Sequence, residues 1–129
     1  MGRTGELGLI AVGGALGALV RYLIGEAFPS TTFPWSTFLV NIAGCALLAL
    51  AIAPTRTKTH QRVLGTGFCG GLTTFSTFSV EVATLAESDQ SLIAIVYLLS
   101  SLGVGLAAFI AVRTAVAPGP PSPSMGQSL

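Results

Sequence analysis

Charged side chains are scarce in this sequence of 129 residues. Lys, Arg, Asp and Glu together make up 9% of it, against about a quarter of an average soluble domain, whereas 51% of it is apolar. There is one histidine, and the two cysteines, Cys45 and Cys69, fit no metal-binding spacing. The shortage of charge excludes an ordinary soluble domain. The absence of a nucleophile–base pair or a set of metal ligands argues against an enzyme.

The chain has long apolar runs in place of charge. Four of them are long enough to cross about 30 Å of hydrocarbon, at residues 7–28, 35–53, 63–86 and 92–112. We therefore predict an all-α integral membrane protein in which residues 1–117 form one subunit with four transmembrane helices. Residues 118–129 are rich in Pro, Ser and Gly and carry no charge, so we expect a disordered C-terminal tail.

The basic residues are distributed unequally between the two sides of the membrane. With four spans, both termini and the second connector share one side, which carries Arg3, Arg56, Lys58, Arg62 and Arg113. The other side carries only Arg21. Because Lys and Arg are enriched in cytoplasmic loops, we predict a multi-pass protein of a bacterial cell membrane with cytoplasmic N- and C-termini. Four helices enclose no wide lumen, so a transport pathway is expected along a helix seam or in an oligomer, most simply a dimer.

The third apolar run contains the segment GFCGGLTTFSTFSVE, residues 67–81, which is poorly suited to a continuous helix. Glycine costs about 1 kcal/mol in a helix interior, and threonine loses rotamer freedom there. We therefore predict that the third helix is broken at mid-span. Unpaired backbone is tolerated inside a membrane only where it is buried in protein or lines a cavity, and its carbonyls suit a small cation such as Na⁺.

Aromatic and hydroxyl side chains follow the predicted break. Phe75 and Phe78 are spaced i,i+3 and share one face, beside the hydroxyls of Ser76 and Thr77. Ring edges are electropositive, so these rings can line the path of an anion, or they can simply fill the core or face lipid. Glu81 lies one turn beyond Thr77, and an ionisable residue inside a span indicates either a functional site or an interfacial hydrogen bond.

The second and fourth runs carry further uncharged donors at helical spacing. Thr37 and Asn41 are four residues apart, as are Tyr97 and Ser101. The Asn41 amide must face protein or water, either in an interhelical hydrogen bond or as a donor to a passing anion. Hydroxyl, amide and ring-edge donors bind a small anion weakly enough to release it, so together these residues predict a small-anion pathway.

The first run contains GGALGALVRY, residues 13–22. It holds two pairs of small residues at the spacing that lets helices approach closely, Gly13 with Gly17 and Gly14 with Ala18. Arg21 follows Gly17 on the same face. Its guanidinium either extends to the membrane interface or pairs with a buried acceptor and keeps a vestibule attractive to anions.

These segments, together with TFLVNIAG at residues 37–44, resemble the bacterial fluoride channels of the Fluc (CrcB) type, and the resemblance covers all four spans. It implies a fluoride-selective channel that passively exports cytoplasmic fluoride and so lowers its concentration and toxicity. It implies an antiparallel dimer of eight helices with two pores. It also implies a structural, untransported Na⁺ at the dimer centre, held by backbone carbonyls of Gly70 and Thr73.

The resemblance further assigns residues to the fluoride pathway: Asn41, Phe75, Ser76, Thr77, Phe78, Glu81, Tyr97 and Ser101. Spacing adds Thr37 to this pathway and Arg21 to its vestibule. Two positions depart from the family pattern: Gly105 stands where related chains often have serine, and Ser36 where glycine is common. The ends of the pathway are therefore less well defined by the resemblance than its middle.

The excess of Lys and Arg on one side of the membrane bears on which chain is the partner in the dimer. Homodimeric members of such a family insert in both orientations, which requires little Lys/Arg bias, whereas this chain is strongly biased. We therefore expect the chain to insert mainly in one orientation. Its partner in the dimer is expected to be either a second copy or an oppositely oriented paralogue. Lipid and fluoride are the other expected partners, and nucleic acid is not expected to bind.

Two other functions belong to small four-span proteins. A proton-coupled multidrug exporter needs a carboxylate in the middle of the first span, whereas Glu6 and Glu26 lie near its ends. A structural or lytic membrane protein needs neither a broken helix nor stripes of donors. Both alternatives fit the sequence less well than a channel.

Overall fold

A computed structural model of the chain describes residues 2–29 and 32–117, and the predicted tail at 118–129 lies outside them. The described residues confirm the all-helical fold. In chain order the elements are α1 (Arg3–Ala27), α2 (Trp35–Ala51), α3 (Lys58–His60), the π-helical η1 (Gln61–Cys69), α4 (Gly70–Leu72), α5 (Phe75–Glu87) and α6 (Ser91–Ala115).

The helices differ in how well they match the predicted spans. Helices α1 and α6 have 25 residues each and are long and apolar enough to cross a membrane. Helix α2 is apolar but has 17 residues and ends two residues earlier than predicted, which gives it a length of about 26 Å. The third predicted span corresponds to two helical segments, one from α3 to α4 and the other α5.

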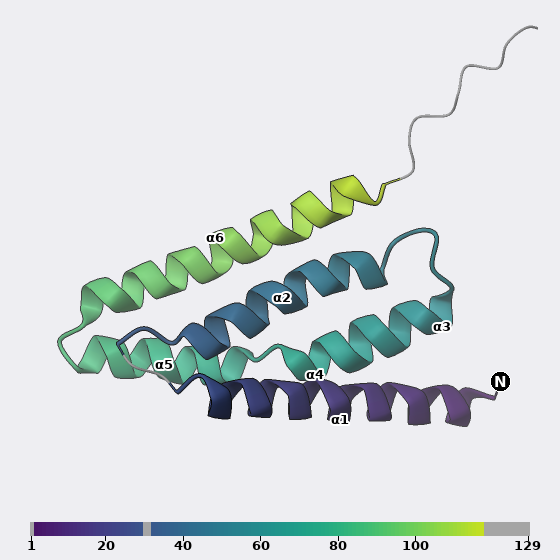
Figure 1. The fold of residues 1–129 in the computed structure, drawn as a ribbon, viewed down its shortest axis with the longest axis horizontal. Helices are drawn as coiled ribbons and strands as arrows, with labels where there is room; N and C mark the ends of the chain where they lie inside the picture. The colour runs from purple at the N-terminus through teal and green to yellow at the C-terminus, as the bar shows by residue number, and fades with distance from the viewer. Residues whose placement is uncertain (1, 30–31, 118–129) are drawn as a thin grey trace, which may run out of the picture.

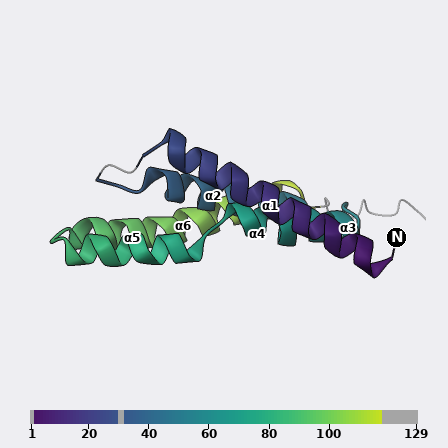
Figure 2. The ribbon, with the colours of Figure 1, turned by 90° about the horizontal axis from the view of Figure 1, so that it is seen from below.

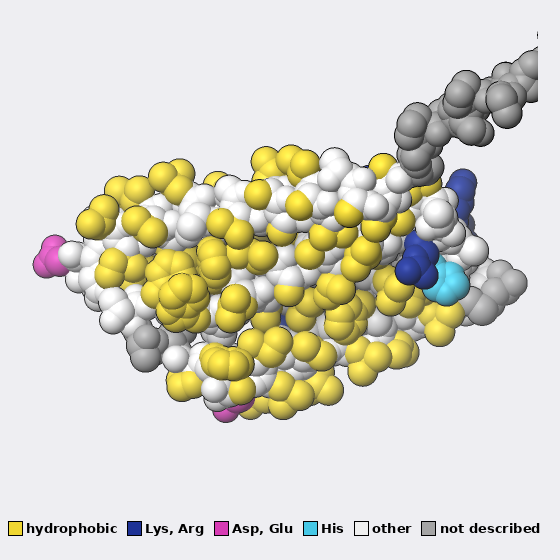
Figure 3. Space-filling model, turned by 45° about the horizontal axis from the view of Figure 1, so that its top comes forward, with side chains coloured by type: hydrophobic (Ala, Val, Ile, Leu, Met, Phe, Trp, Pro, Cys, Tyr) yellow, Lys and Arg dark blue, Asp and Glu magenta, His cyan; other side chains and the backbone are white. Residues whose placement is uncertain are grey.

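The helices lie alongside one another in an elongated bundle (Figure 1). Helix α1 packs on η1 and α4, whereas α6 packs on α2 and α5; α5 and α6 lie side by side in the view from below (Figure 2). The start of α1, the connection from α2 to α3 and the end of α6 are at the same end of the bundle (Figure 1). Basic side chains gather at that end, and the face between the two ends is largely hydrophobic (Figure 3).

Glycines allow α1 to approach the third helical region closely. A Cβ atom on Gly13 would lie 2.8 Å from the carbonyl oxygen of Val63, and one on Gly17 would lie 2.7 Å from the backbone nitrogen of Leu72. A Cβ atom on Gly14 would make only an ordinary contact of 3.7 Å. Of the two small-residue pairs seen in the sequence, Gly13 with Gly17 is therefore the one whose glycines leave no room for a Cβ atom.

The π-helical pairing of η1 was not predicted. At its end, the backbone N–H of Gly70 donates to the carbonyl of Gly65, five residues earlier. Gly65 and Gly67 are buried, and a Cβ atom on Gly67 would lie 2.7 Å from the carbonyl oxygen of Ile10 in α1. Segments of this kind are rare and often occur near functional sites, and only the short helix α4 separates η1 from the interruption described next.

Candidate functional site

The third helical region is interrupted at two threonines. Helix α4 ends at Leu72, Thr73 and Thr74 have extended backbones, and α5 begins at Phe75. Thr73 closes the first segment, since its N–H and its Oγ1 both donate to the carbonyl of Cys69 at 3.0 Å. Thr74 opens the second as an N-cap, because its Oγ1 accepts from the N–H of Thr77 at 3.1 Å.

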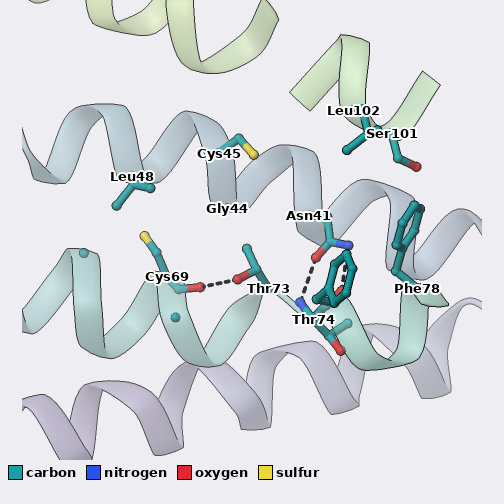
Figure 4. Close-up of a pocket in the computed structure, with 13 residues that line it drawn as sticks. Asn41, Gly44, Cys45, Leu48, Cys69, Thr73, Thr74, Phe78, Ser101 and Leu102 are labelled. Atoms are coloured by element: carbon teal, nitrogen blue, oxygen red, sulfur yellow. Dashed lines mark hydrogen bonds between the residues drawn. The ribbon is translucent and has the colours of Figure 1, made fainter. Parts of the chain in front are cut away.

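Asn41 of α2 makes hydrogen bonds with both the N–H and the carbonyl group of the extended Thr74 backbone. Its Oδ1 accepts from the Thr74 N–H at 2.8 Å, and its Nδ2 donates to the Thr74 carbonyl at 3.0 Å (Figure 4). Both backbone groups of Thr74 are thus satisfied away from a regular helix. The amide makes an interhelical hydrogen bond, one of the two roles considered for it, and its second Nδ2 hydrogen remains for another acceptor.

The end of α4 presents carbonyl oxygens. The Gly71 carbonyl accepts from Arg21 Nε at 3.2 Å, so Arg21 pairs with an acceptor from the protein. Among the described residues, the carbonyls of Gly70, Leu72 and Thr73 have no hydrogen-bond partner. A Cβ atom on Gly70 would meet nothing within 4 Å, so the backbone there is open. These oxygens are at the negative end of a helix dipole, which favours a cation.

Glu81 joins three helices through its two carboxylate oxygens. Thr37 of α2 donates from Oγ1 to Oε1 at 2.8 Å, and Tyr97 of α6 donates from its hydroxyl to Oε2 at 2.7 Å. Tyr97 is 0% exposed. A carboxylate that accepts a separate hydroxyl donor at each oxygen is well suited to carry negative charge between helices.

Most of the residues predicted to form the site lie around two cavities, although Ser76 and Tyr97 line neither of them. The first has a volume of about 360 Å³ and includes Asn41, Phe75, Phe78 and Ser101 in its wall (Figure 4). The second has a volume of about 430 Å³, and the predicted residues in its wall are Arg21, Thr37, Thr77 and Glu81. Thr74 lines both cavities.

The two phenylalanines differ in burial. Phe78 is 6% exposed and packs on Tyr97 with ring centroids 5.1 Å apart, whereas Phe75 is 79% exposed. Their own centroids are 6.1 Å apart, as expected for a shared helix face. Phe75 therefore does not fill the core of this chain.

Two hydroxyls of the predicted pathway are placed differently. Ser76 is exposed, with its Oγ 3.3 Å from Oγ1 of Thr74. The Oγ of Ser101 is buried and has no hydrogen-bond partner among the described residues. A buried hydroxyl without a partner in the protein is available to a ligand or to water.

Thr74 is the residue of this site that the sequence analysis missed. A signal was present, because threonine directly before an apolar helical stretch is a favourable N-cap. Its contact with Asn41 had no such signal, because the two residues are separated by 33 positions in the chain.

These features define a class: a small helical membrane protein whose third helical region is interrupted beside two cavities that have hydroxyl, amide or carboxylate groups in their walls. Residues 8–112 match the family described as "CrcB-like protein, Camphor Resistance (CrcB)". The chain belongs to the CrcB family, which confirms the resemblance stated from its motifs.

Relatives in this family carry names that state a function. The chain is 50% identical over 101 residues to "Fluoride-specific ion channel FluC 2" of Rhodococcus jostii (strain RHA1), covering 78% of this chain and 89% of that protein. It is 45% identical over 101 residues to "Fluoride-specific ion channel FluC 1" of Ligilactobacillus salivarius (strain UCC118), covering 77% and 89%. It is 41% identical over 116 residues to "Fluoride-specific ion channel FluC" of Oceanobacillus iheyensis, covering 84% and 89%.

Proposed function

We propose that the protein is a fluoride-selective ion channel through which cytoplasmic fluoride leaves the cell passively, which lowers its concentration and toxicity. The observation that carries this proposal is the 50% identity over 101 residues to a protein named as a fluoride-specific ion channel. That relationship favours ion conduction over a multidrug exporter, a lytic protein or an enzyme.

The proposed pathway runs past the start of α5, between the two cavities. The first backbone N–H groups of that helix, those of Phe75 and Ser76, have no hydrogen-bond partner among the described residues. A helix N-terminus carries partial positive charge and favours an anion. The second amide hydrogen of Asn41 and the hydroxyl of Ser101 add donors beside the ring edges of Phe75 and Phe78.

At the other cavity, hydroxyl donors and a carboxylate control the approach to the pathway. The hydroxyls of Thr37 and Tyr97 both donate to Glu81. A fluoride ion near the Thr37 hydroxyl, which lines this cavity, competes with Glu81 for its hydrogen, which keeps fluoride binding weak enough for release. The hydroxyl of Thr77 and the guanidinium of Arg21 in the same cavity attract the anion without enclosing it.

A fluoride efflux assay tests the proposal. The purified protein is reconstituted in liposomes loaded with fluoride, and release is followed with a fluoride electrode. We expect rapid fluoride efflux and no comparable chloride efflux from liposomes loaded with chloride. An absence of fluoride efflux, both alone and with a candidate paralogue present, would refute the proposed function.

We further propose that the carbonyls of Gly70 and Thr73 hold a structural Na⁺ that is not transported. The fit rests on their lack of protein partners, their place at the end of α4 and the open space beside Gly70. Hard oxygen ligands of this kind suit a small cation, which would neutralise the carbonyl dipoles where the helix stops. In the efflux assay, replacing Na⁺ by a large organic cation is expected to lower the flux; equal flux would reject the sodium site alone.

The proposed functional unit is an antiparallel dimer of eight helices. The exposed ring of Phe75 and the open backbone at Gly70 lie beside the first cavity and would be covered by a partner. The partner is a second copy of this chain or an oppositely oriented paralogue. Several relatives bear the numbered names FluC 1 and FluC 2, which accords with paralogous chains in those organisms.

The basic bias predicts one dominant orientation, with both termini in the cytoplasm. A cleavable tag at each terminus, probed with protease from either side of the cell membrane, measures this directly. We expect both tags to be protected from outside. Substantial cleavage of both tags from outside would show dual orientation and favour the homodimer.

A further inference from the structure

The connection between α1 and α2 carries an aromatic residue that contacts the site. The ring centroid of Phe33 lies 5.2 Å from that of Tyr97 in α6, with the ring planes at 77°. Phe33 also packs on Trp35 at 4.6 Å and on Phe38 at 5.5 Å, both near the start of α2. The edge-to-face geometry of Phe33 with Tyr97 and with Phe38 is a favourable one for aromatic pairs, so Phe33 links the connection to α6.

The ring of Tyr97 is held from two directions. Phe33 contacts it from the connection, and Phe78 contacts it from α5 at 5.1 Å. Tyr97 is 0% exposed, and its hydroxyl donates to Glu81 Oε2 at 2.7 Å. Because the hydroxyl of a tyrosine is fixed to its ring, the position of the ring decides whether this hydrogen bond forms.

We propose that Phe33 is a positioning residue for the pathway: its ring holds Tyr97 in the orientation that donates to Glu81, although Phe33 itself lines neither cavity. The inference rests on the proposed function. Phe78 contacts the ring from α5, the helix that carries Glu81. Phe33 belongs to a different part of the chain and fixes the ring relative to α2.

The first test measures fluoride efflux in a double-mutant cycle of Phe33 and Tyr97. Phe33→Leu removes the ring contact and is expected to lower fluoride efflux about tenfold, as expected when a hydrogen bond to a charged group is weakened. Phe33→Tyr keeps the ring and is expected to stay within about twofold of the unmodified chain. If Phe33 acts through Tyr97, then Phe33→Leu has no further effect in a Tyr97→Phe background, where the hydrogen bond is already absent.

The control is Trp35→Leu, which removes another ring of the same cluster. Trp35 contacts Phe33 and Phe38 and is 54% exposed, and no ring contact joins it to Tyr97. Its flux is expected to remain within about twofold of the unmodified chain, as for an exposed substitution away from the site. Equal losses for Phe33→Leu in both backgrounds, or unchanged flux in Phe33→Leu, would overturn the inference.

A second readout does not depend on flux. The chain has two tyrosines, so Tyr22→Phe leaves Tyr97 as the sole contributor to the tyrosine Raman doublet, which reports hydroxyl hydrogen bonding. Adding Phe33→Leu is expected to move the intensity ratio of the two lines away from the value of a hydroxyl that donates a strong hydrogen bond. An unchanged intensity ratio would contradict the inference. Should Phe33→Leu fail to fold, Phe33→Met takes its place. If the unmodified chain shows no fluoride flux but Phe33→Leu still changes the Raman intensity ratio, the proposed function is contradicted and the positioning role of Phe33 is supported.

Discussion

Asn41→Asp is expected to lower fluoride efflux at least about a hundredfold, in a chain that still folds. Aspartate keeps an oxygen to accept from the Thr74 N–H but has no hydrogen to donate to the Thr74 carbonyl. A buried carbonyl without its partner costs about 1–3 kcal/mol. The substitution also places negative charge beside the proposed pathway of an anion. Efflux from liposomes, measured with a fluoride electrode, checks the expectation.

Gln61→Glu is the matched control because it makes the same change from amide to carboxylate. The Gln61 amide, at the start of η1, also donates to backbone carbonyls, those of Ala53 and Arg56 at 3.3 Å, but these belong to the connection between α2 and α3. Its flux is expected to remain within about twofold of the unmodified chain. Near-normal flux in Asn41→Asp would mean that the Asn41 amide is not needed for conduction.

Gly17→Ala is expected to have a comparably large effect, on folding rather than on conduction. The added Cβ atom would meet the carbonyl oxygen of Phe68 and lie 2.7 Å from the Leu72 nitrogen. These are backbone atoms, which cannot move aside as a side chain can. We expect a loss of at least about 2 kcal/mol of stability, seen as a lower yield of monodisperse protein and a lower melting temperature in detergent.

Gly14→Ala tests whether this effect depends on the face of the helix. Gly14 lies in the same helix, but its added Cβ atom would make only one ordinary contact, 3.7 Å from the Gly67 carbonyl oxygen. Alanine also favours a helix by about 1 kcal/mol over glycine, so the yield is expected to be unchanged or higher. Equal losses in both variants would show that the loss does not depend on the close contact of Gly17 with Phe68 and Leu72.

Much of the fold followed from local properties of the sequence. Long apolar runs predicted the helices, and the Gly-Gly and Thr-Thr pairs predicted the region where α4 ends and α5 begins, because these residues weaken a helix wherever they occur. The length of α2 and the π-helical pairing of η1 did not follow. Apolar periodicity marks a helix but fixes neither its last residue nor whether its hydrogen bonds span four or five residues.

The site was predicted less completely than the fold. Helical spacing placed Phe75 near Phe78. The free-energy cost of burying an amide without hydrogen bonds required Asn41 to have a partner. Spacing within one helix says nothing about which residue another helix presents, so the bonds from Asn41 to Thr74 remained hidden. The contact between Phe33 and Tyr97 was hidden for the same reason, because it joins a connection to a helix 64 positions later.

Of the described residues that line the two cavities, Thr74 alone lines both. If the proposed pathway joins these cavities and water fills them from opposite sides, the insulating layer between them would be much thinner than the about 30 Å of hydrocarbon around the protein. A membrane voltage falls mainly across the least conducting layer, so the electric field would be concentrated near this residue. In the proposed channel, most of the electrical work on a moving anion, about 2.3 kcal/mol per charge at 100 mV, would then be done near Thr74.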